Sequence, residues 1–345
     1  MAAHPAARPL VLLDPAPRTA EEILAPATRA RLDAGFEVIE RGDAAPAAFY
    51  AEHLPRAAFV VGQPALDAAA IATAERLRAL VNVEGNFLQN VDYAALFARG
   101  ARALVASAVF ARPVAELALG LTLSLARDIH GNHAAFADAS ERYGLAGNRR
   151  ARLLDRCELG FVGFGDLGRA VLDVFAGFRP RVRAFDPWLS PDVLRREGIE
   201  PVGLEELLSG SDVVQVVASV TPESVRLLGA PELALMRPDA LLVILSRADV
   251  VDFGALAEAC REGRIRAATD VLPEEPLAAD DPLRDVPNLL LSAHRAGALE
   301  SALLEIGERV VADLELMARG LPPQNCKRAE PELVGRLRSR PVARS

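Results

Sequence analysis

The chain has 345 residues, of which 51% are hydrophobic and 25% charged, and its formal net charge at pH 7 is −8. A chain of this length and composition can bury large apolar cores, and its length favours two domains. The negative charge and the lack of a basic stripe in the body of the chain argue against nucleic acid and anionic membranes as partners. These properties are typical of a soluble α/β enzyme.

The cysteines and the first residues predict where the protein resides. Cys157, Cys260 and Cys326 are odd in number, widely separated and without CxxC spacing. This pattern favours reduced thiols over a disulfide framework or a zinc site, so we expect no metal. The opening MAAHPAARP lacks the charged and apolar regions of a secretory signal, and no later uncharged segment is long enough to span a bilayer. We therefore expect a cytoplasmic protein without membrane contact.

Strand and helix patterns alternate along the first part of the chain. Short apolar runs predict buried strands at 10–13, 37–40, 58–62, 77–83 and 103–106. An amphipathic helix is predicted at 20–34, and a second, more apolar helix begins near Pro113, a residue suited to a first helical turn, and ends at about Ile129. Residues 131–156 are polar and irregular. The alternation predicts a parallel sheet with crossover helices.

The second part of the chain repeats this alternation. Further strands are predicted at 159–162, 182–185, 212–217, 240–245, 266–271 and 289–292. A last helix is predicted at 301–318. From Gly320 the chain carries several prolines, six basic residues from Lys327 on and no sustained apolar period, so we expect 331–345 to be a disordered tail. A nucleic-acid arm is the less favoured interpretation of these charges.

The segment LGFVGFGDLGRAVLDVFAGFRPRVRAFD predicts a dinucleotide site. An apolar strand leads into a glycine turn and a helix, and a second apolar strand ends at Asp186. Gly163 permits the tight turn, Gly165 lets the backbone approach a pyrophosphate, and Gly168 allows close packing of helix and strand. Asp186 lies near the offset at which an acid binds the adenosine ribose hydroxyls. The alternative is an ordinary strand–turn–helix whose glycines only allow packing.

Polar residues follow several of the later apolar strands. Arg247 comes just after the run LLVILS, Asp270 ends RIRAATD, Glu275 lies in LPEEP, and His294 follows LLLSA. Ligands in open α/β sheets lie beyond the carboxyl ends of the strands, and a guanidinium there can bind a carboxylate through two hydrogen bonds. Each residue alone is commonly a solvated charge, a cap or a structural hydrogen-bonding group. Their joint occurrence after a dinucleotide site favours catalysis.

With these features the chain resembles the D-2-hydroxyacid dehydrogenase family, which includes phosphoglycerate, glyoxylate/hydroxypyruvate, formate and phosphite dehydrogenases. The resemblance covers nearly the whole chain before the tail. The motifs that carry it are NVDYAALFARG, VAELALGLTLSLAR, GFGDLG, AFDPW, SDVV, LALMRPDALLVILSR, ATDVLPEEPL and NLLLSAH. It implies an NAD-dependent oxidoreductase that interconverts a 2-oxo acid and a D-2-hydroxy acid. Catalysis is then expected from a substrate-binding arginine, a carboxylate partner and a general acid/base: Arg247, Glu275 and His294.

The resemblance also implies the residues that bind cofactor and substrate. The NAD contacts are expected at Gly163, Phe164, Gly165, Asp166, Leu167, Gly168, Asp186, Pro187, Ser219, Ser246, Asp270 and His294. Asp270 is expected to hold the nicotinamide carboxamide. The substrate contacts are expected from Arg247 and from the loop Gly85-Asn86-Phe87, whose backbone N–H groups meet the carboxylate. Because Phe87 stands where a second glycine is frequent, its ring is expected to face the rest of the substrate.

The expected architecture is α/β, with two doubly wound parallel-sheet, Rossmann-like domains and the active site in the cleft between them. Residues 1–107 with 296–330 form the substrate domain, and 108–295 form the NAD-binding domain. The family also implies a homodimer through the Val114–Ile129 helix region.

The chain departs from the family at several loop positions while its charged groups are intact. Ala248 stands where glycine is usual, and Ser219 and Ala293 stand where proline is frequent. We expect activity on glyoxylate, hydroxypyruvate or a short-chain 2-oxo acid. An NAD-sensing regulatory protein resembling the corepressors of this fold, and a phosphite-type dehydrogenase, are the alternatives. Formate is disfavoured, because formate enzymes have glutamine where Glu275 stands.

Overall fold

The computed structural model describes residues 8–337, which divide into two compact units. Unit 1 comprises the residues up to Phe110 and those from Ala298 onward, and unit 2 comprises Ala111–Gly297. The boundaries expected from the sequence, at 107 and 295, lie within a few residues of these. The opening segment considered above as a possible signal lies mostly outside the described residues.

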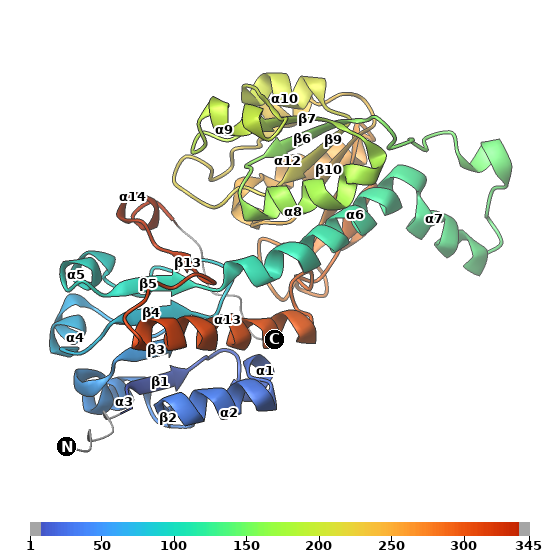
Figure 1. The fold of residues 1–345 in the computed structure, drawn as a ribbon. Helices are drawn as coiled ribbons and strands as arrows, with labels where there is room; N and C mark the ends of the chain where they lie inside the picture. The colour runs from blue at the N-terminus through green and yellow to red at the C-terminus, as the bar shows by residue number, and fades with distance from the viewer. Residues whose placement is uncertain (1–7, 338–345) are drawn as a thin grey trace, which may run out of the picture. The chain divides into compact units, whose positions relative to one another are not determined.

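Unit 1 contains a six-stranded sheet with the order β13-β5-β4-β3-β1-β2 (Figure 1). Its strands are β1 (Leu10–Asp14), β2 (Glu37–Glu40), β3 (Phe59–Gly62), β4 (Ala79–Asn82), β5 (Arg102–Val105) and β13 (Lys327–Arg328). All neighbouring pairs are parallel except β13 with β5, which is antiparallel. The expected parallel sheet therefore has one antiparallel edge strand.

Both faces of this sheet are covered by helices. Val11 and Leu13 of β1 pack with one group of helices: α1 (Ala20–Ile23), α2 (Pro26–Gly35) and α13 (Glu300–Ala318). Leu10 and Leu12 pack with the other group: α3 (Pro46–His53), α4 (Ala68–Thr73), α5 (Tyr93–Ala98) and α14 (Pro331–Val334). This alternation is the period-two pattern of a doubly covered strand.

The helix predicted at 20–34 is two helices. It is interrupted because α1 ends at Ile23 and Pro26 begins α2, where a proline costs nothing since the first helical N–H has no partner.

The tail prediction is wrong for the part of it that is described. Residues 331–334 form α14, and Val334 and Leu337 are buried in the core of unit 1. Residues 338–345 lie outside the described residues. Two buried apolar residues three positions apart are too few to produce a periodic pattern in a proline-containing segment, which is why composition alone indicated disorder.

Unit 2 contains a seven-stranded parallel sheet with the order β12-β11-β10-β9-β6-β7-β8 (Figure 1). Its strands are β6 (Glu158–Val162), β7 (Arg181–Phe185), β8 (Glu200–Pro201), β9 (Val213–Val216), β10 (Ala240–Ile244), β11 (Ile265–Thr269) and β12 (Leu289–Leu291). Successive strands are added on one side of β6 up to β8 and on the other side from β9 onward. This reversal is the place where open α/β sheets bind ligands.

Helices also cover both faces of the unit 2 sheet. One face carries α6 (Ala111–Arg127), α8 (Asp166–Phe175) and α9 (Pro191–Arg196). The other face carries α10 (Leu204–Gly210), α11 (Ala230–Leu235) and α12 (Phe253–Arg261).

Within the described residues, one helical stretch, Ser107–Arg127, is long and apolar enough to cross a membrane by length and composition alone. It includes α6, which packs within unit 2 against α8, β10 and β11. These contacts bury one side of α6, including Ala118, Leu121 and Leu125.

Candidate active site

The glycine turn after β6 has the geometry of a phosphate-binding loop. Gly163 has φ +82°, and a Cβ there would lie 2.6 Å from the Cα of Ala218, so only glycine fits. At Gly168 a Cβ would lie 3.0 Å from the Phe164 ring. At Gly165, which caps α8, a Cβ would meet no atom within 4 Å. Gly165 thus leaves open space at the start of α8, where the resemblance predicts the pyrophosphate.

Asp186 ties the end of β7 to this turn. Its carboxylate accepts hydrogen bonds from the N–H of Phe164 at 2.7 Å and of Trp188 at 2.8 Å. The Phe164 ring is fully buried and packs edge-on against Phe161. Phe164, expected to contact the cofactor, therefore uses its N–H and its ring to support the loop from inside. The N–H of Leu189 is a third donor, at 3.2 Å. A carboxylate has about four acceptor sites and Asp186 is only partly buried, so it retains capacity for ribose hydroxyls.

His294 and Glu275 form the closest pair among the predicted catalytic residues. His294 Nδ1 lies 2.6 Å from Glu275 Oε2, and Glu275 Oε1 accepts a hydrogen bond from the N–H of Leu272 at 2.8 Å. Both side chains are about three-quarters buried. His294 has φ +47°, an unfavourable backbone conformation for a residue with a Cβ. A carboxylate at Nδ1 fixes the ring, so Nε2 is the ring nitrogen that this pair leaves to other partners.

Asp270 holds the backbone that carries His294. Its carboxylate is 1% exposed and accepts hydrogen bonds from the Ser292 hydroxyl and from the N–H groups of Arg295 at 3.1 Å and Ala296 at 2.9 Å. These donors lie on both sides of His294. The expected contact of Asp270 with a nicotinamide carboxamide stays a prediction, since these three donors define only the contacts of Asp270 within unit 2.

Arg247 lies three positions after the last residue of β10, just past the strand as predicted. Its Nη1 donates a hydrogen bond to the Ser246 carbonyl at 2.6 Å, and the buried Ser246 hydroxyl has no hydrogen-bond partner among the described residues. Ala248, which stands where glycine is usual, begins a 3-10 turn, Ala248–Val250, in which a Cβ is tolerated. Ser219 lies in the loop after β9, and its backbone carbonyl accepts a hydrogen bond from the Ser224 hydroxyl.

The loop 84–91 of unit 1, called the substrate loop below, differs from the prediction. Phe87 is 2% exposed and its ring lies edge-on to Tyr93, so it belongs to the core of unit 1 and does not face a substrate. Its N–H donates to the Asn86 side-chain oxygen at 2.8 Å, a bond that a substrate carboxylate would have to displace. Gly85 and Asn86 are the less buried members of the predicted set.

An ion pair beside the substrate loop was missed from the sequence. Arg18 Nε lies 3.1 Å from Glu84 Oε1, and the Glu84 side chain is 6% exposed. The Arg18 guanidinium also lies 5.8 Å from the Phe110 ring centroid, and a Cβ at Gly85 would lie 3.6 Å from that same ring. The available signal was a carboxylate placed directly before Gly85.

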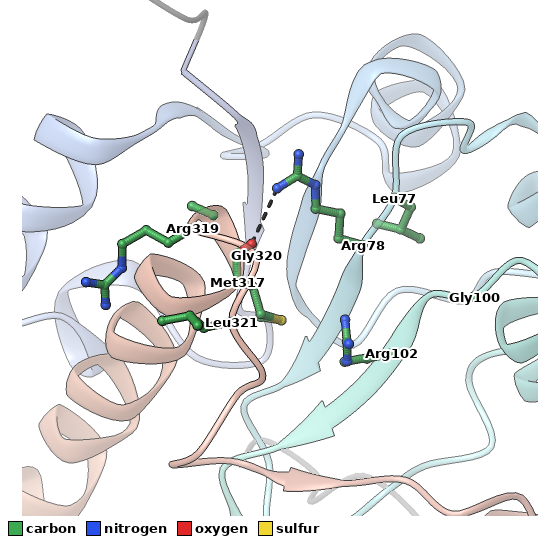
Figure 2. Close-up of a pocket in the computed structure, with 9 residues that line it drawn as sticks. Leu77, Arg78, Gly100, Arg102, Met317, Arg319, Gly320 and Leu321 are labelled. Carbon is green, nitrogen blue, oxygen red and sulfur yellow. Dashed lines mark hydrogen bonds between the residues drawn. The ribbon is translucent and has the colours of Figure 1, made fainter.

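A hollow of about 550 Å³ lies at the amino-terminal ends of β4 and β5 in unit 1. It is bordered by Arg78, Arg102 and Arg319, but Figure 2 shows the Arg319 guanidinium pointing away from the other two. Arg78 donates to the Met317 carbonyl at 3.4 Å. These arginines border the C-terminal end of α13 and do not converge on one ligand, and none of the predicted site residues lies there.

The described residues contain no group of three or more His, Cys, Asp or Glu side chains placed to hold a metal ion.

The fold and the site together define a dinucleotide-binding α/β protein with a histidine–carboxylate pair at the carboxyl ends of its strands. Residues 119–296 match the sequence profile described as "D-isomer specific 2-hydroxyacid dehydrogenase, NAD binding domain". The chain belongs to the D-isomer specific 2-hydroxyacid dehydrogenase family, and the cofactor of this domain is NAD.

Individual relatives support this membership. The chain is 46% identical to a phosphoglycerate oxidoreductase from Rhizobium etli of solved structure, with a TM-score of 0.84, over 94% of this chain and 99% of that one. It is 30% identical over 259 residues to a D-3-phosphoglycerate dehydrogenase of Methanocaldococcus jannaschii, which is 74% of this chain and 48% of the relative. It is 38% identical over 168 residues to a glyoxylate reductase of Korarchaeum cryptofilum, which is 48% of this chain and 51% of the relative. The aligned region thus spans about half the length of these two curated relatives.

Proposed function

We propose that the chain is an NAD-dependent oxidoreductase that interconverts a 2-oxo acid and a D-2-hydroxy acid. The observation that carries this proposal is the 2.6 Å contact between His294 and Glu275 within an NAD-binding domain. Carbonyl reduction requires a proton at the oxygen as hydride reaches the carbon, and a histidine held by a carboxylate is suited to supply it near neutral pH.

Each proposed catalytic residue has a separate role in the reaction. Bound NADH supplies the hydride. His294 donates the proton to the substrate oxygen through Nε2, while Glu275 stabilises the imidazolium at Nδ1 and fixes the ring. Arg247 binds the substrate carboxylate and stabilises negative charge on the carbonyl oxygen. In the direction of oxidation the same ring accepts the hydroxyl proton.

Asp186 sets the preference for NAD over NADP in this proposal. Its carboxylate repels a 2′-phosphate, and the Pro187-Trp188 that follows supplies no cation. Asp186→Ser should reduce the NADH-over-NADPH ratio of kcat/KM by roughly one to two orders of magnitude, because it removes a like charge from the phosphate position. Equal turnover of NADH and NADPH by the unaltered protein would reject this assignment of Asp186.

We also propose a compact, unphosphorylated substrate such as glyoxylate, hydroxypyruvate or a short-chain 2-oxo acid. The support is electrostatic. Arg18, the cation beside the substrate loop, is paired with Glu84 at 3.1 Å, so the pair offers little net positive charge to a phosphate. A phosphorylated acid is the alternative that the names of two relatives favour.

One substrate panel tests this proposal and its alternatives. Oxidation of NADH is followed with glyoxylate, hydroxypyruvate, pyruvate and phosphohydroxypyruvate, and reduction of NAD is followed with phosphite. Turnover of the unphosphorylated acids is expected. Strong turnover of phosphohydroxypyruvate alone would reject the substrate choice, and turnover of phosphite alone would reject the acid class. Tight NADH binding without any turnover would favour an NAD-sensing regulatory protein.

A homodimer is proposed through α6 and the arm that follows it, α7 (Ile129–Ala134) and the residues up to 156. Large apolar side chains of this arm are exposed, at 75% for Tyr143, 83% for Leu145 and 75% for Leu153. Burial against the same arm of a second copy would remove this apolar area from water. Sedimentation at micromolar concentration should give twice the mass of one chain.

A reducing cytoplasm is the compartment that fits the thiols. Cys157, Cys260 and Cys326 are free and buried. Burial raises the pKa of Cys157 to about 11 and of Cys260 to about 12, so both remain protonated and unreactive at neutral pH.

A further inference from the structure

The C-terminal arm, residues 324–337, is directed back onto unit 1 by a buried carboxylate. Asp313 of α13 is fully buried, and its side chain accepts hydrogen bonds from the backbone N–H groups of Gln324 at 2.7 Å, Asn325 at 3.0 Å and Cys326 at 2.8 Å. The chain then forms β13 along β5. This clamp determines where the rest of the arm lies.

The end of the arm packs behind the substrate loop. Gln89 Nε2 donates to the Leu337 carbonyl at 3.1 Å. Val334 and Leu337 are buried in the same apolar cluster as Phe87 and Val91. A hollow of about 380 Å³ between the arm and α5 is lined on one side by Gln89, Val91 and residues of α5, and on the other by Pro331, Val334 and Gly335.

The substrate loop depends on these inward contacts for its shape. Phe87 and Tyr93 lie edge-on with ring centroids 6.4 Å apart, and the Tyr93 hydroxyl donates to the Leu88 carbonyl at 2.6 Å. Burial raises the pKa of Tyr93 to about 12, so this hydroxyl keeps its proton and its donor role at neutral pH. The Phe87 and Leu88 side chains thus point into unit 1, and the exposed Gly85 leaves backbone beside them for a ligand.

We propose that the C-terminal arm is a positioning element for the substrate loop, through Leu337 and Gln89. The arm completes the apolar cluster that holds Phe87, and it fixes Gln89 by a hydrogen bond. Loosening it would let the loop backbone move and weaken carboxylate binding, since small displacements of positioning groups cost large factors in activity. This proposal rests on the proposed function, because that function assigns the carboxylate to this loop.

The test uses full-length variants of the arm and a matched control. Leu337→Ser and Gln89→Leu should raise KM for the 2-oxo acid roughly tenfold, with kcat changed less and with NADH affinity unchanged, because binding and not chemistry is disturbed. Leu321→Ser, at a leucine 47% exposed, is the control and should leave KM unchanged. A folded Leu337→Ser variant with unaltered KM would show that the arm is structural only.

A second measurement does not depend on activity. Hydrogen–deuterium exchange of residues 84–91 should be roughly tenfold faster in Leu337→Ser than in the control, because local opening becomes easier when packing is lost. Unchanged exchange would overturn the proposal. If the unaltered protein reduces no 2-oxo acid but the variant still accelerates exchange, the positioning role stands and the proposed function fails.

Discussion

Two regions with proposed roles in catalysis are held in opposite ways: the catalytic cluster of unit 2, which is Asp270, Glu275 and His294, and the substrate loop of unit 1. In the cluster the working groups are side chains, and each is fixed by a partner: His294 by Glu275, and the backbone around His294 by Asp270. In the loop the side chain of Phe87 is buried, and the backbone is the part proposed to bind a ligand. Changes at the cluster should therefore alter chemistry, whereas changes at the loop should alter stability and substrate binding.

Removing the His294 imidazole should have the largest effect on kcat of all changes in the cluster. His294→Ala should lower kcat for carbonyl reduction by roughly two to four orders of magnitude, the usual contribution of a positioned general acid. The dissociation constant for NADH, measured by fluorescence titration, should stay within a small factor.

His53→Ala is the matched control, because His53 lies in unit 1 against Phe49 and far in sequence from the predicted site. Its kcat should equal that of the unaltered protein. A near-normal kcat in His294→Ala would remove the histidine from the mechanism and favour the NAD-sensing alternative.

Truncating the buried ring tests the loop side of the comparison. Phe87→Ala should lower the free energy of unfolding by about 3–5 kcal/mol, because it leaves a cavity in the core of unit 1. Phe87→Leu, which keeps most of the volume, should cost about 1 kcal/mol. Urea denaturation measures both variants. If Phe87 instead faced the substrate, Phe87→Ala would leave stability unchanged and would broaden the range of acids reduced.

Asp270 separates a positioning role from a cofactor contact. Asp270→Asn weakens the hold on the backbone around His294 and should lower kcat roughly tenfold to a hundredfold, because a misplaced general acid transfers its proton poorly. NADH affinity should change little. A large rise in the NADH dissociation constant with little change in kcat would instead support the carboxamide contact implied by the family resemblance.

Much of the fold was predictable because its signals are local. Each predicted strand overlaps an observed one, since buried parallel strands are short apolar runs in sequence. The roles of Gly163 and Gly168 followed from the same local pattern, and the structure gives the steric reason for each. The contact between His294 and Glu275 was expected from the resemblance and not from spacing, because the two residues are 19 positions apart.

The features that the sequence could not predict concern partners that are distant in sequence. Whether Phe87 points outward or inward depends on core residues such as Leu337, about 250 positions away, and Gln89 bonds to that residue across a separation of 248. Whether Asp270 is available to a ligand depends on Arg295 and Ala296. No window of local sequence contains these pairings. The ligand roles of Phe87 and Asp270 were implied by the family resemblance, and the burial of Phe87 contradicts its expected outward orientation.

The charge beside the substrate loop provides the finest test of the comparison, because it should change substrate choice without changing chemistry. Arg18 and Glu84 are paired at 3.1 Å, and their side chains are 19% and 6% exposed. Glu84→Gln keeps the shape of the side chain and removes its charge, so the Arg18 guanidinium gains net positive character towards an anionic substituent.

The ratio of kcat/KM for phosphohydroxypyruvate to that for hydroxypyruvate should then rise by roughly threefold to tenfold, a change of up to about 1.4 kcal/mol. Glu37→Gln is the control, because Glu37 of β2 forms an exposed ion pair with Arg56. This variant should leave the ratio unchanged. Salt should reduce the gain, because a partly exposed guanidinium is screened. An unaltered ratio in a folded Glu84→Gln protein would show that Arg18 lies outside the reach of the substrate, and specificity would then have to come from other groups.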